Sequence, residues 1–332
     1  MKTSPRAQRL LGRPVVEAGA VPGYEAIFNA GLLHHVGVYH LFARGIRTGY
    51  RRNPRGEGPR FLDYVSDVLV FESVDGLAYQ FKYVIAQAGV DGSSSFEDPR
   101  VQRVHSEGGD HVVMTFTHLL PDDGEHPWRI GMRELVYRAG RFSVDPSIGG
   151  IIGPGGIPNK DGVVFNLADA KVALLHRVYP SVQVAIFDSL NQMTSADGAY
   201  WREHMVEINR HTIIVPARSA LGVGAGAPPV LSEAGPILFF HERRADGSYT
   251  MNVALLDARN GRVVARLDEP LLEPELPWER EGDSAQGVVF VEGAHRRDDG
   301  TIYLTYGAGD RSVGAAVVEE RHLLEALEAA AR

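Results

Sequence analysis

The chain has 332 residues, of which 44% are hydrophobic and 23% are charged, as is usual for a globular protein. Its net charge of −8 argues against nucleic acid or an anionic membrane surface as the main partner. The chain has no cysteine, which excludes disulfides, thiolate metal sites and a cysteine nucleophile.

The N-terminal segment carries no export signal that we can identify. Residues 1–14 are basic but lack the apolar core of a signal peptide. No apolar run in the chain reaches the length needed to span a membrane. We therefore expect a cytoplasmic protein in which residues 1–20 form an N-terminal extension.

Strand signals follow through most of the chain. Short apolar runs with alternating polarity are separated by Gly, Asp, Asn and Pro, which is the pattern of strands and turns. Asp-Gly or Asn-Gly pairs suit turns with positive φ and occur at 75–76, 246–247, 260–261 and 299–300. The predicted strands include 36–43, 67–71, 111–117, 172–177, 182–187, 237–241, 251–256, 288–291 and 301–306.

The predicted strands form a weak repeat. A strand that ends in an aromatic residue or leucine recurs roughly every 60 to 75 residues, a spacing that suits four strands with their loops. Because radial repetition of antiparallel sheets is typical of a β-propeller, we predict an all-β protein with a single five-bladed β-propeller domain over 1–332. A pair of β-sandwiches and a β-helix are the alternatives. Helical pattern is convincing only at the C-terminus, where residues 318–332 predict a short helix.

The segment 95–101, with sequence SFEDPRV, is the first candidate for chemistry. Proline disfavours helical geometry for Asp98, the residue before it, so that carboxyl group is held on extended backbone. Arg100 follows and can bind a carboxylate or an anionic group of a substrate. A rigid acid beside a cation predicts a proton donor. The alternative is a surface turn with a local ion pair.

Other polar residues stand at the ends of predicted strands. In a propeller such ends converge on the axis, so Lys160, Arg177, His241 and Asp310 are expected to share one polar funnel with Asp98. Each has a structural alternative, such as a surface ion pair or a buried histidine with its own partner. Aromatic residues at predicted loops could stack on sugars, but we expect most to pack between blades; they are Tyr39, Tyr64, Phe96, Trp128, Tyr179 and Trp201.

The Gly-rich stretch at 222–229 is a further feature. It lacks the Gly-Lys-Ser/Thr ending of a P-loop and leads into a strand instead of a helix, so we reject a nucleotide site there. The NAD fingerprint fails for the same reason.

Twelve short motifs, taken in order, resemble glycoside hydrolase family 130, which comprises β-mannoside phosphorylases and some β-mannosidases. The resemblance covers roughly residues 26–317, and it implies a five-bladed propeller that cleaves β-mannosidic bonds with inversion. The motifs are Phe28-Asn29-Ala30-Gly31, Phe42-Ala43-Arg44, Ser73-Val74-Asp75-Gly76, Glu97-Asp98-Pro99-Arg100-Val101, Lys160-Asp161-Gly162-Val163-Val164-Phe165, Leu175-His176-Arg177, Gly224-Ala225-Gly226-Ala227-Pro228-Pro229, Phe240-His241, Ala254-Leu255-Leu256-Asp257, Pro270-Leu271-Leu272-Glu273-Pro274, Gly287-Val288-Val289-Phe290 and Tyr306-Gly307-Ala308-Gly309-Asp310.

The resemblance implies a role for each candidate. Asp98 matches the general acid, and Lys160 and Arg177 match cations that hold phosphate, the nucleophile of a phosphorylase. An inverting enzyme needs its nucleophile on the opposite face of the sugar, and phosphate needs no protein base. The remaining expected contacts to the substrate, a β-mannoside oligosaccharide, are Arg44, Arg100, Asp161, His241 and Asp310. We expect no metal and no cofactor besides phosphate, and a homo-oligomer is possible.

Departures from the family pattern keep other functions open. The phosphorylases carry a lysine where this chain has Gly222, and an arginine is missing beside Ser66-Asp67. Glu242 replaces a glycine and is the candidate base that would activate water in a β-mannoside hydrolase; its alternative is an ion pair with Arg243 or Arg244. We expect phosphorolysis first because Lys160 and Arg177 remain, then hydrolysis, then a sugar-binding propeller without catalysis.

Overall fold

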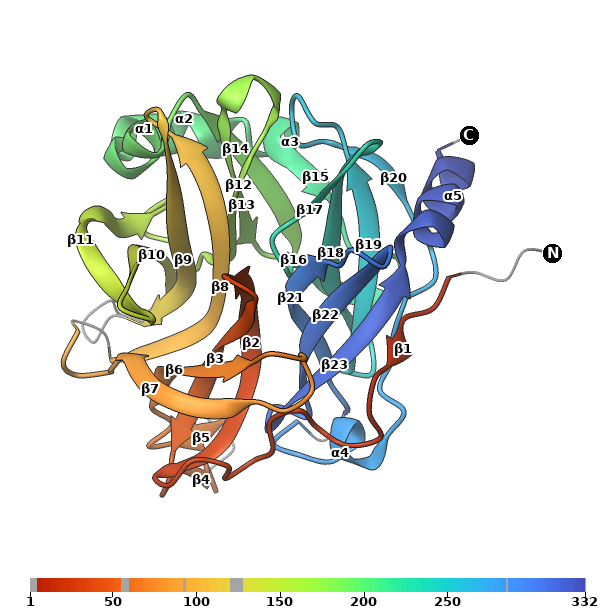
Figure 1. Ribbon diagram of the computed structural model, residues 1–332. Helices are drawn as coiled ribbons and strands as arrows, with labels where there is room; N and C mark the ends of the chain where they lie inside the picture. Colours follow the sequence, from red (N-terminus) through yellow and green to blue (C-terminus); the bar gives the residue numbers. More distant parts are fainter. Residues whose placement is uncertain (1–4, 55–59, 92–93, 120–127, 285, 332) are drawn as a thin grey trace.

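Five antiparallel sheets surround a central axis in the computed structural model (Figure 1). The structure describes residues 5–54, 60–91, 94–119, 128–284 and 286–331. The predicted five-bladed β-propeller with a short C-terminal helix is confirmed. No helix within these ranges is long and apolar enough to cross a membrane.

The first three blades follow one another along the chain. Blade I contains β2 (Tyr24–His35), β3 (Val38–Arg47), β6 (Ser66–Ser73) and β7 (Gln80–Ala86), and a small hairpin, β4 (Arg51–Arg52) with β5 (Phe61–Leu62), projects from it. Blade II contains β8 (Ser95–Ser106), β9 (Gly109–Leu119), β10 (Trp128–Arg138) and β11 (Arg141–Ile152). Blade III contains β12 (Lys160–Asn166), β13 (Val172–Val178), β14 (Ser181–Phe187) and β15 (Thr212–Ile214).

The last two blades complete the ring. Blade IV contains β16 (Ala220–Ala225), β18 (Gly235–Arg244), β19 (Tyr249–Leu256) and β20 (Val263–Arg266), with β17 (Val230–Ser232) paired to β18. Blade V contains β21 (Val289–Arg296), β22 (Thr301–Ala308), β23 (Ser312–Glu319) and β1 (Gln8–Arg9). The first strands pack in sequence around the axis, β21 on β2, β2 on β8, β8 on β12 and β12 on β16.

Strand β1 closes the ring between the two ends of the chain. Gln8 pairs with Val317 and Arg9 with Ala316, so the N-terminus supplies the outermost strand of blade V. The expected extension at 1–20 is therefore partly built into the last blade, where it ties the first residues to the last sheet. A strand of 2 residues is too short to leave a periodic signal in the sequence.

Apolar side chains fill the interfaces between neighbouring blades. Five main clusters of buried residues each join two adjacent sheets, as alternating strands with one face on each neighbour require. Helix α5 (Glu320–Ala330) covers the cluster between blades IV and V with Leu323 and Leu327. The remaining helices are η1 (Ala168–Ala170), α1 (Leu190–Ser195), α2 (Gly198–Val206), α3 (Ile208–His211) and α4 (Pro277–Arg280).

Helices α1 to α3 were not predicted. They are 6, 9 and 4 residues long and lie between the last two strands of blade III. Side-chain caps begin the first two: Ser189 accepts from the Gln192 amide, and Asp197 accepts from the amides of Ala199 and Tyr200. Such short helices show little periodicity, so packing against blades II and III and not pattern defines them.

Bulges in the inner strands turn polar residues toward the axis. The pairing register shifts in β2 at Asn29, in β8 at Asp98, in β12 at Asp161 and in β21 at Glu292. The first three residues have φ of 46°, 52° and 56°, the left-handed conformation that Asn and Asp tolerate best. The prediction that Asp98 lies on extended backbone is therefore wrong. A bulge re-aims a side chain, so the same local device is used in four blades.

Candidate active site

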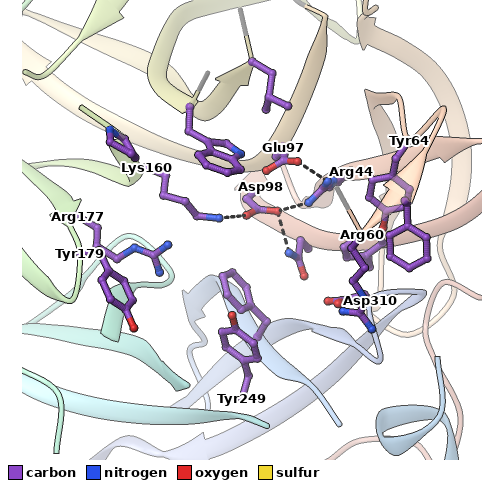
Figure 2. A pocket seen from close by; sticks show the side chains of 17 residues that line it. Arg44, Arg60, Tyr64, Glu97, Asp98, Lys160, Arg177, Tyr179, Tyr249 and Asp310 are labelled. Atoms are coloured by element: carbon purple, nitrogen blue, oxygen red, sulfur yellow. Dashed lines mark hydrogen bonds and ion pairs between the residues drawn. The ribbon is translucent and has the colours of Figure 1, made fainter. Parts of the chain in front are cut away.

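A cavity of about 800 Å³ opens among the inner strands. Its polar wall includes Asp98, Lys160, Arg177 and Asp310, which come from blades II, III and V (Figure 2). The sequence predicted that these four side chains share one funnel, and the structure brings them together. The cavity is large enough for a disaccharide and an anion.

Asp98 is held by three side chains. Its Oδ1 accepts hydrogen bonds from Asn29 Nδ2 at 2.8 Å and Arg44 Nη1 at 3.2 Å. Its Oδ2 lies 3.9 Å from Lys160 Nζ. Asp98 lines the cavity but is only 2% exposed. Its carboxyl group is therefore almost completely buried.

Opposing effects set the charge of this carboxyl group. Burial alone would raise the pKa of Asp98, but the charges of Arg44 and Lys160 outweigh it and the pKa lies below its usual value. The free site therefore holds Asp98 ionised at neutral pH. The role of general acid that the resemblance implies for Asp98 requires a proton when the glycosidic bond breaks, so that role needs a change in this balance.

Two neighbouring cations, Lys160 and Arg177, belong to the cavity lining. Lys160 and Arg177 are cross-strand partners on β12 and β13, and both line the cavity. Figure 2 shows the lysine ammonium directed at Asp98 and the arginine reaching into the open space below it. Two neighbouring cations on one wall are an arrangement that can hold an anion such as phosphate.

Asp161 does not line the cavity but fixes one of these cations. It is 0% exposed, and its Oδ2 lies 2.9 Å from Arg177 Nη1. Burial would raise the pKa of Asp161, but Arg177 and His241 hold it well below the usual range. The expected contact with substrate is therefore corrected to a supporting role: Asp161 orients Arg177.

Asp310 faces the cavity across from Lys160 and Arg177, beside Arg60 (Figure 2). Burial raises the pKa of Asp310 to about 6, and the nearby negative charge of Asp98 adds to the rise. Its backbone has φ of 59°. This carboxyl group changes charge just below neutral pH and can donate or accept a hydrogen bond with a sugar hydroxyl there.

Arg44 lies in the cavity wall, as expected, and is firmly held. Its Nη2 donates to Glu97 Oε1 at 2.6 Å, and its guanidinium lies 5.1 Å from the centre of the Phe28 ring. Glu97 also lines the cavity. Arg44 thus binds both neighbouring acids of the Glu-Asp-Pro-Arg motif, Glu97 and Asp98.

Arg100 was expected to bind substrate, and the structure corrects this. The side chain is 1% exposed and lies off the cavity lining. It donates to the backbone oxygens of Asp98 at 3.0 Å, Ala225 at 3.1 Å and Gly226 at 2.8 Å. Its Nη2 lies 3.1 Å from Glu292 Oε1. Arg100 therefore joins blades II, IV and V beneath the acid.

His241 is also corrected from a substrate contact to a support. It is 1% exposed, lies off the cavity lining, and stacks on Phe290 with ring centres 3.9 Å apart. Its Nε2 lies 3.5 Å from Asp161 Oδ2. Burial lowers the pKa of His241 to about 4, so the ring is neutral at pH 7. It backs Phe290, which does line the cavity.

Glu242 is not placed to activate water. Its carboxylate lies 2.6 Å from Arg266 Nη2 and accepts from the Ala217 amide at 3.0 Å, and the residue lies outside the cavity lining. Strand alternation explains this, because adjacent His241 and Glu242 point to opposite faces of β18. The anticipated partners Arg243 and Arg244 were wrong as well, since the cation comes from β20.

More aromatic side chains line the cavity than the sequence predicted. Tyr64, Trp128 and Tyr179 line the cavity, together with Tyr249 and Phe290, which the sequence reading missed. The motif Gly287-Val288-Val289-Phe290 carried a signal for Phe290, because it lies in the family pattern. Aromatic faces beside a polar wall suit the apolar faces of sugar rings.

Gly222 stands where the family pattern led us to expect a phosphate-binding lysine. A Cβ atom placed there would lie 2.8 Å from Tyr179 Cε2. The Tyr179 hydroxyl donates to the Leu221 carbonyl at 2.6 Å, which holds the ring over the glycine. A side chain at position 222 would therefore have to displace Tyr179.

No group of three or more His, Cys, Asp or Glu side chains that could hold a metal ion occurs among the residues that the structure describes.

Comparison with known proteins identifies relatives along nearly the whole chain. A family model, Glyco_hydro_130, described as β-1,4-mannooligosaccharide phosphorylase, matches residues 6–329. A 1,2-β-oligomannan phosphorylase of Thermoanaerobacter sp. (strain X514) is 29% identical over 325 residues, covering 96% of this chain and 99% of the relative.

Solved structures share the fold. A β-1,2-mannobiose phosphorylase from Listeria innocua in complex with β-1,2-mannobiose has a TM-score of 0.75 at 19% identity, covering 97% of this chain and 99% of the other. Another structure comes from a report that the family contains hydrolases that target β-1,2 mannosidic linkages in Candida mannan. It has a TM-score of 0.68 at 19% identity and covers 95% of this chain and 94% of the other.

Proposed function

From the premise that this chain belongs to glycoside hydrolase family 130, we propose that it cleaves β-mannosidic bonds by phosphorolysis, with inversion, and releases mannose 1-phosphate. One observation carries the choice of phosphorolysis. Lys160 and Arg177 line the same cavity as Asp98. The cavity can therefore bind a phosphate ion while Asp98 protonates a glycosidic oxygen.

In this proposal different residues bind the phosphate and donate the proton. Phosphate binds Lys160 and Arg177 and attacks the anomeric carbon of the mannosyl group from the face opposite the leaving oxygen. Asp98 donates a proton toward that oxygen as the bond breaks. Because the incoming phosphate is already an anion, the reaction needs no protein base. Arg44 and Asp310 border the mannosyl group, and the aromatic rim holds the remainder of the oligosaccharide.

Hydrolysis is the second candidate, and the structure removes its main support. The base proposed from the sequence, Glu242, is paired with Arg266 away from the cavity. The acidic side chains among the described lining residues are Glu97, Asp98 and Asp310. Glu97 is bound to Arg44. A non-catalytic sugar-binding propeller would have no use for an acid held as Asp98 is held.

The test is turnover with and without phosphate. The purified protein is incubated with β-1,2- and β-1,4-mannobiose, each in phosphate and in a non-nucleophilic buffer of equal ionic strength. We expect mannose 1-phosphate only with phosphate, and the preferred disaccharide identifies the linkage. Free mannose formed equally in both buffers would refute the proposal in favour of hydrolysis. Binding without any product would refute both.

Three further parts of the proposal concern the setting of the reaction. We propose inorganic phosphate as the co-substrate, with no metal or organic cofactor. A β-mannoside oligosaccharide is the proposed binding partner, and the protein is proposed to be cytoplasmic. Whether it forms a homo-oligomer can be measured by light scattering of the purified chain.

A further inference from the structure

Lys160 is required in two places at once. As a phosphate ligand its ammonium must face the bound anion, yet in the structure that group lies 3.9 Å from Asp98 Oδ2. Within the described part of the chain, Asp98 is the carboxylate with which Lys160 forms an ion pair. One ammonium group can lie between both anions, but a closer contact with phosphate lengthens and weakens its contact with Asp98.

The other cations of the described cavity lining have partners of their own: Arg60 donates to the backbone oxygen of Asp283, and the other two pair with carboxylates. Arg177 is held by Asp161 at 2.9 Å, and Arg44 is held by Glu97 at 2.6 Å. The Arg44 side chain is 9% exposed, whereas that of Lys160 is 25% exposed and sits on a flexible stem. Lys160 is therefore the cation that can most easily move from the acid to the anion.

Asp98 has further charged neighbours that stay in place. Arg100 contacts its backbone oxygen from below, and the carboxyl groups of Glu292 and Asp310 act on it from blade V. Burial raises the pKa of Glu292 well above its usual value, which favours its neutral form. The polar and charged groups that act on Asp98 from the packed elements are Asn29, Arg44, Arg100, Lys160, Glu292 and Asp310.

We propose that Lys160 is a shared cation, which pairs with Asp98 in the free enzyme and turns to phosphate in the complex, so that phosphate binding itself favours protonation of the acid. The inference rests on the proposed phosphorolysis and deepens it. It makes the acid ready only when the nucleophile is present, which disfavours cleavage by water in an empty phosphate site.

The proton balance closes over one cycle. On phosphate binding, Asp98 takes one proton from solvent. When phosphate attacks the anomeric carbon, the new carbon–oxygen bond forms, the glycosidic bond breaks, and that proton goes to the leaving oxygen. Asp98 is left ionised, and when mannose 1-phosphate departs, Lys160 pairs with it again. Lys160 acts through Asp98 and is, for this step, a positioning residue.

The experiment follows the Asp98 carboxyl group directly. Protein labelled with ¹³C at the aspartate carboxyl groups is titrated by NMR without sugar, and the Asp98 signal is identified by its loss in Asp98→Asn. Sulfate is the probe, because it mimics phosphate without titrating in this range. Removing an opposite charge at this distance is expected to raise the pKa of Asp98 by about 1 to 3 units. An unchanged pKa in saturating sulfate would overturn the inference, as would failure of sulfate and phosphate to bind.

Variants of the lysine separate a change of partner from the field of the anion. In Lys160→Met the pKa of Asp98 should already be raised without sulfate and should respond little to it. Lys160→Gln provides a second neutral variant if the first is unstable, and Lys160→Arg should retain a low pKa. An Asp98 pKa as low in both neutral variants as in the parent would contradict the shared-cation role.

The outcome is independent of the turnover assay. If turnover requires phosphate but the pKa of Asp98 does not respond to sulfate, this inference fails and phosphorolysis stands. If mannose forms without phosphate, the proposed function fails, whatever the titration gives.

Discussion

Asp98 occupies a backbone conformation that restricts which residue can replace it. Its φ of 52° lies in the left-handed region, which asparagine tolerates nearly as well as aspartate. In Asp98→Asn the new side-chain amide could still accept a hydrogen bond from Asn29 or Arg44 through its oxygen. The chemistry of the residue can therefore be removed while its geometry is kept.

Asp98→Asn is expected to lower kcat by about 10²- to 10⁴-fold, because general acid catalysis typically contributes that much. The midpoint of thermal unfolding should change little, because the backbone conformation is retained. Initial rates of mannose 1-phosphate formation and a thermal scan measure the two effects. Unaltered activity would mean that another group donates the proton.

Glu242 provides the matched comparison at this scale. Glu242→Gln keeps the shape of a buried side chain that lies off the cavity, so phosphorolysis should persist at nearly the parent rate per folded molecule. The ion pair with Arg266 is lost, so some stability should be lost. A drop in kcat comparable with that of Asp98→Asn would restore Glu242 to the site.

The inner strands act together because Arg100 joins them. One buried guanidinium binds backbone oxygens at the end of β16 and in β8, and carboxylates of β12 and β21. Three of these strands, β8, β12 and β21, are bulged and could otherwise shift against one another, since bulges interrupt their ladders. Arg100 thus fixes the height of Asp98 relative to the walls of the cavity.

Arg100→Met is expected to destabilise the protein by roughly 3 to 5 kcal/mol, because it leaves the buried Glu292 carboxyl group and three buried backbone oxygens without their partner. Arg103→Met, on the same strand but exposed, is the control and should cost about 1 kcal/mol or less. Urea unfolding of both variants measures the difference. Equal stability of the two would contradict the joining role of Arg100.

Ring closure is the feature of the whole molecule on which the site depends. Arg9 on β1 donates to both carboxylate oxygens of Glu279, at 2.7 and 2.8 Å, and Glu279 is 0% exposed. This pair fastens the outer strand of blade V to helix α4. Opening the ring at this seam would let the five blades separate.

Arg9→Ala should therefore lower the free energy of unfolding by about 3 kcal/mol, because it leaves Glu279 buried without its cation. Arg13→Ala removes an exposed arginine 4.0 Å from Glu17 and should cost almost nothing. Both variants are compared by urea unfolding, and equal midpoints would show that β1 does not carry the closure.

Buried neutral histidines give the whole molecule a pH dependence. Burial lowers the pKa of His176 to about 3 and of His241 to about 4. Between these values and the unfolded value near 6.5, the unfolded chain binds more protons than the folded one. Stability should therefore fall as pH is lowered through this window, by up to about 1.4 kcal/mol per pH unit for each histidine.

Urea unfolding at a series of pH values from 7 down to about 4.5 measures this slope. His241→Asn should make the slope shallower, because one of the buried rings that resists protonation is gone. A slope equal to that of the parent would mean that His241 has the same pKa in the folded and the unfolded chain.

The blades could be predicted from sequence because period-two alternation and Asp-Gly turns are local signals. The four glycines of the predicted turns have φ between 66° and 88°, as expected. Asp98, Lys160, Arg177 and Asp310 could also be grouped, because strand ends of a propeller converge. Local pattern therefore carried both the fold and the central acid with its cations.

The outer limits of the site could not be predicted from local sequence. Bulges decide whether a residue such as Asp161 or Arg100 faces the cavity or lies beneath it, and a bulge has little sequence signal. Glu242 is bound by Arg266 of a neighbouring strand, a pairing that depends on register. The position of a residue relative to the axis, and not its type, decides whether it lines the cavity or supports a residue that does.

The most direct test of phosphorolysis by this cavity is the first product of the reaction, followed by NMR. With β-mannobiose and phosphate, attack from the face opposite the leaving oxygen predicts α-mannose 1-phosphate and free mannose in equal amounts, both formed at the rate at which β-mannobiose disappears. Free mannose formed without an equal amount of mannose 1-phosphate, or a β-linked phosphate, would contradict the account.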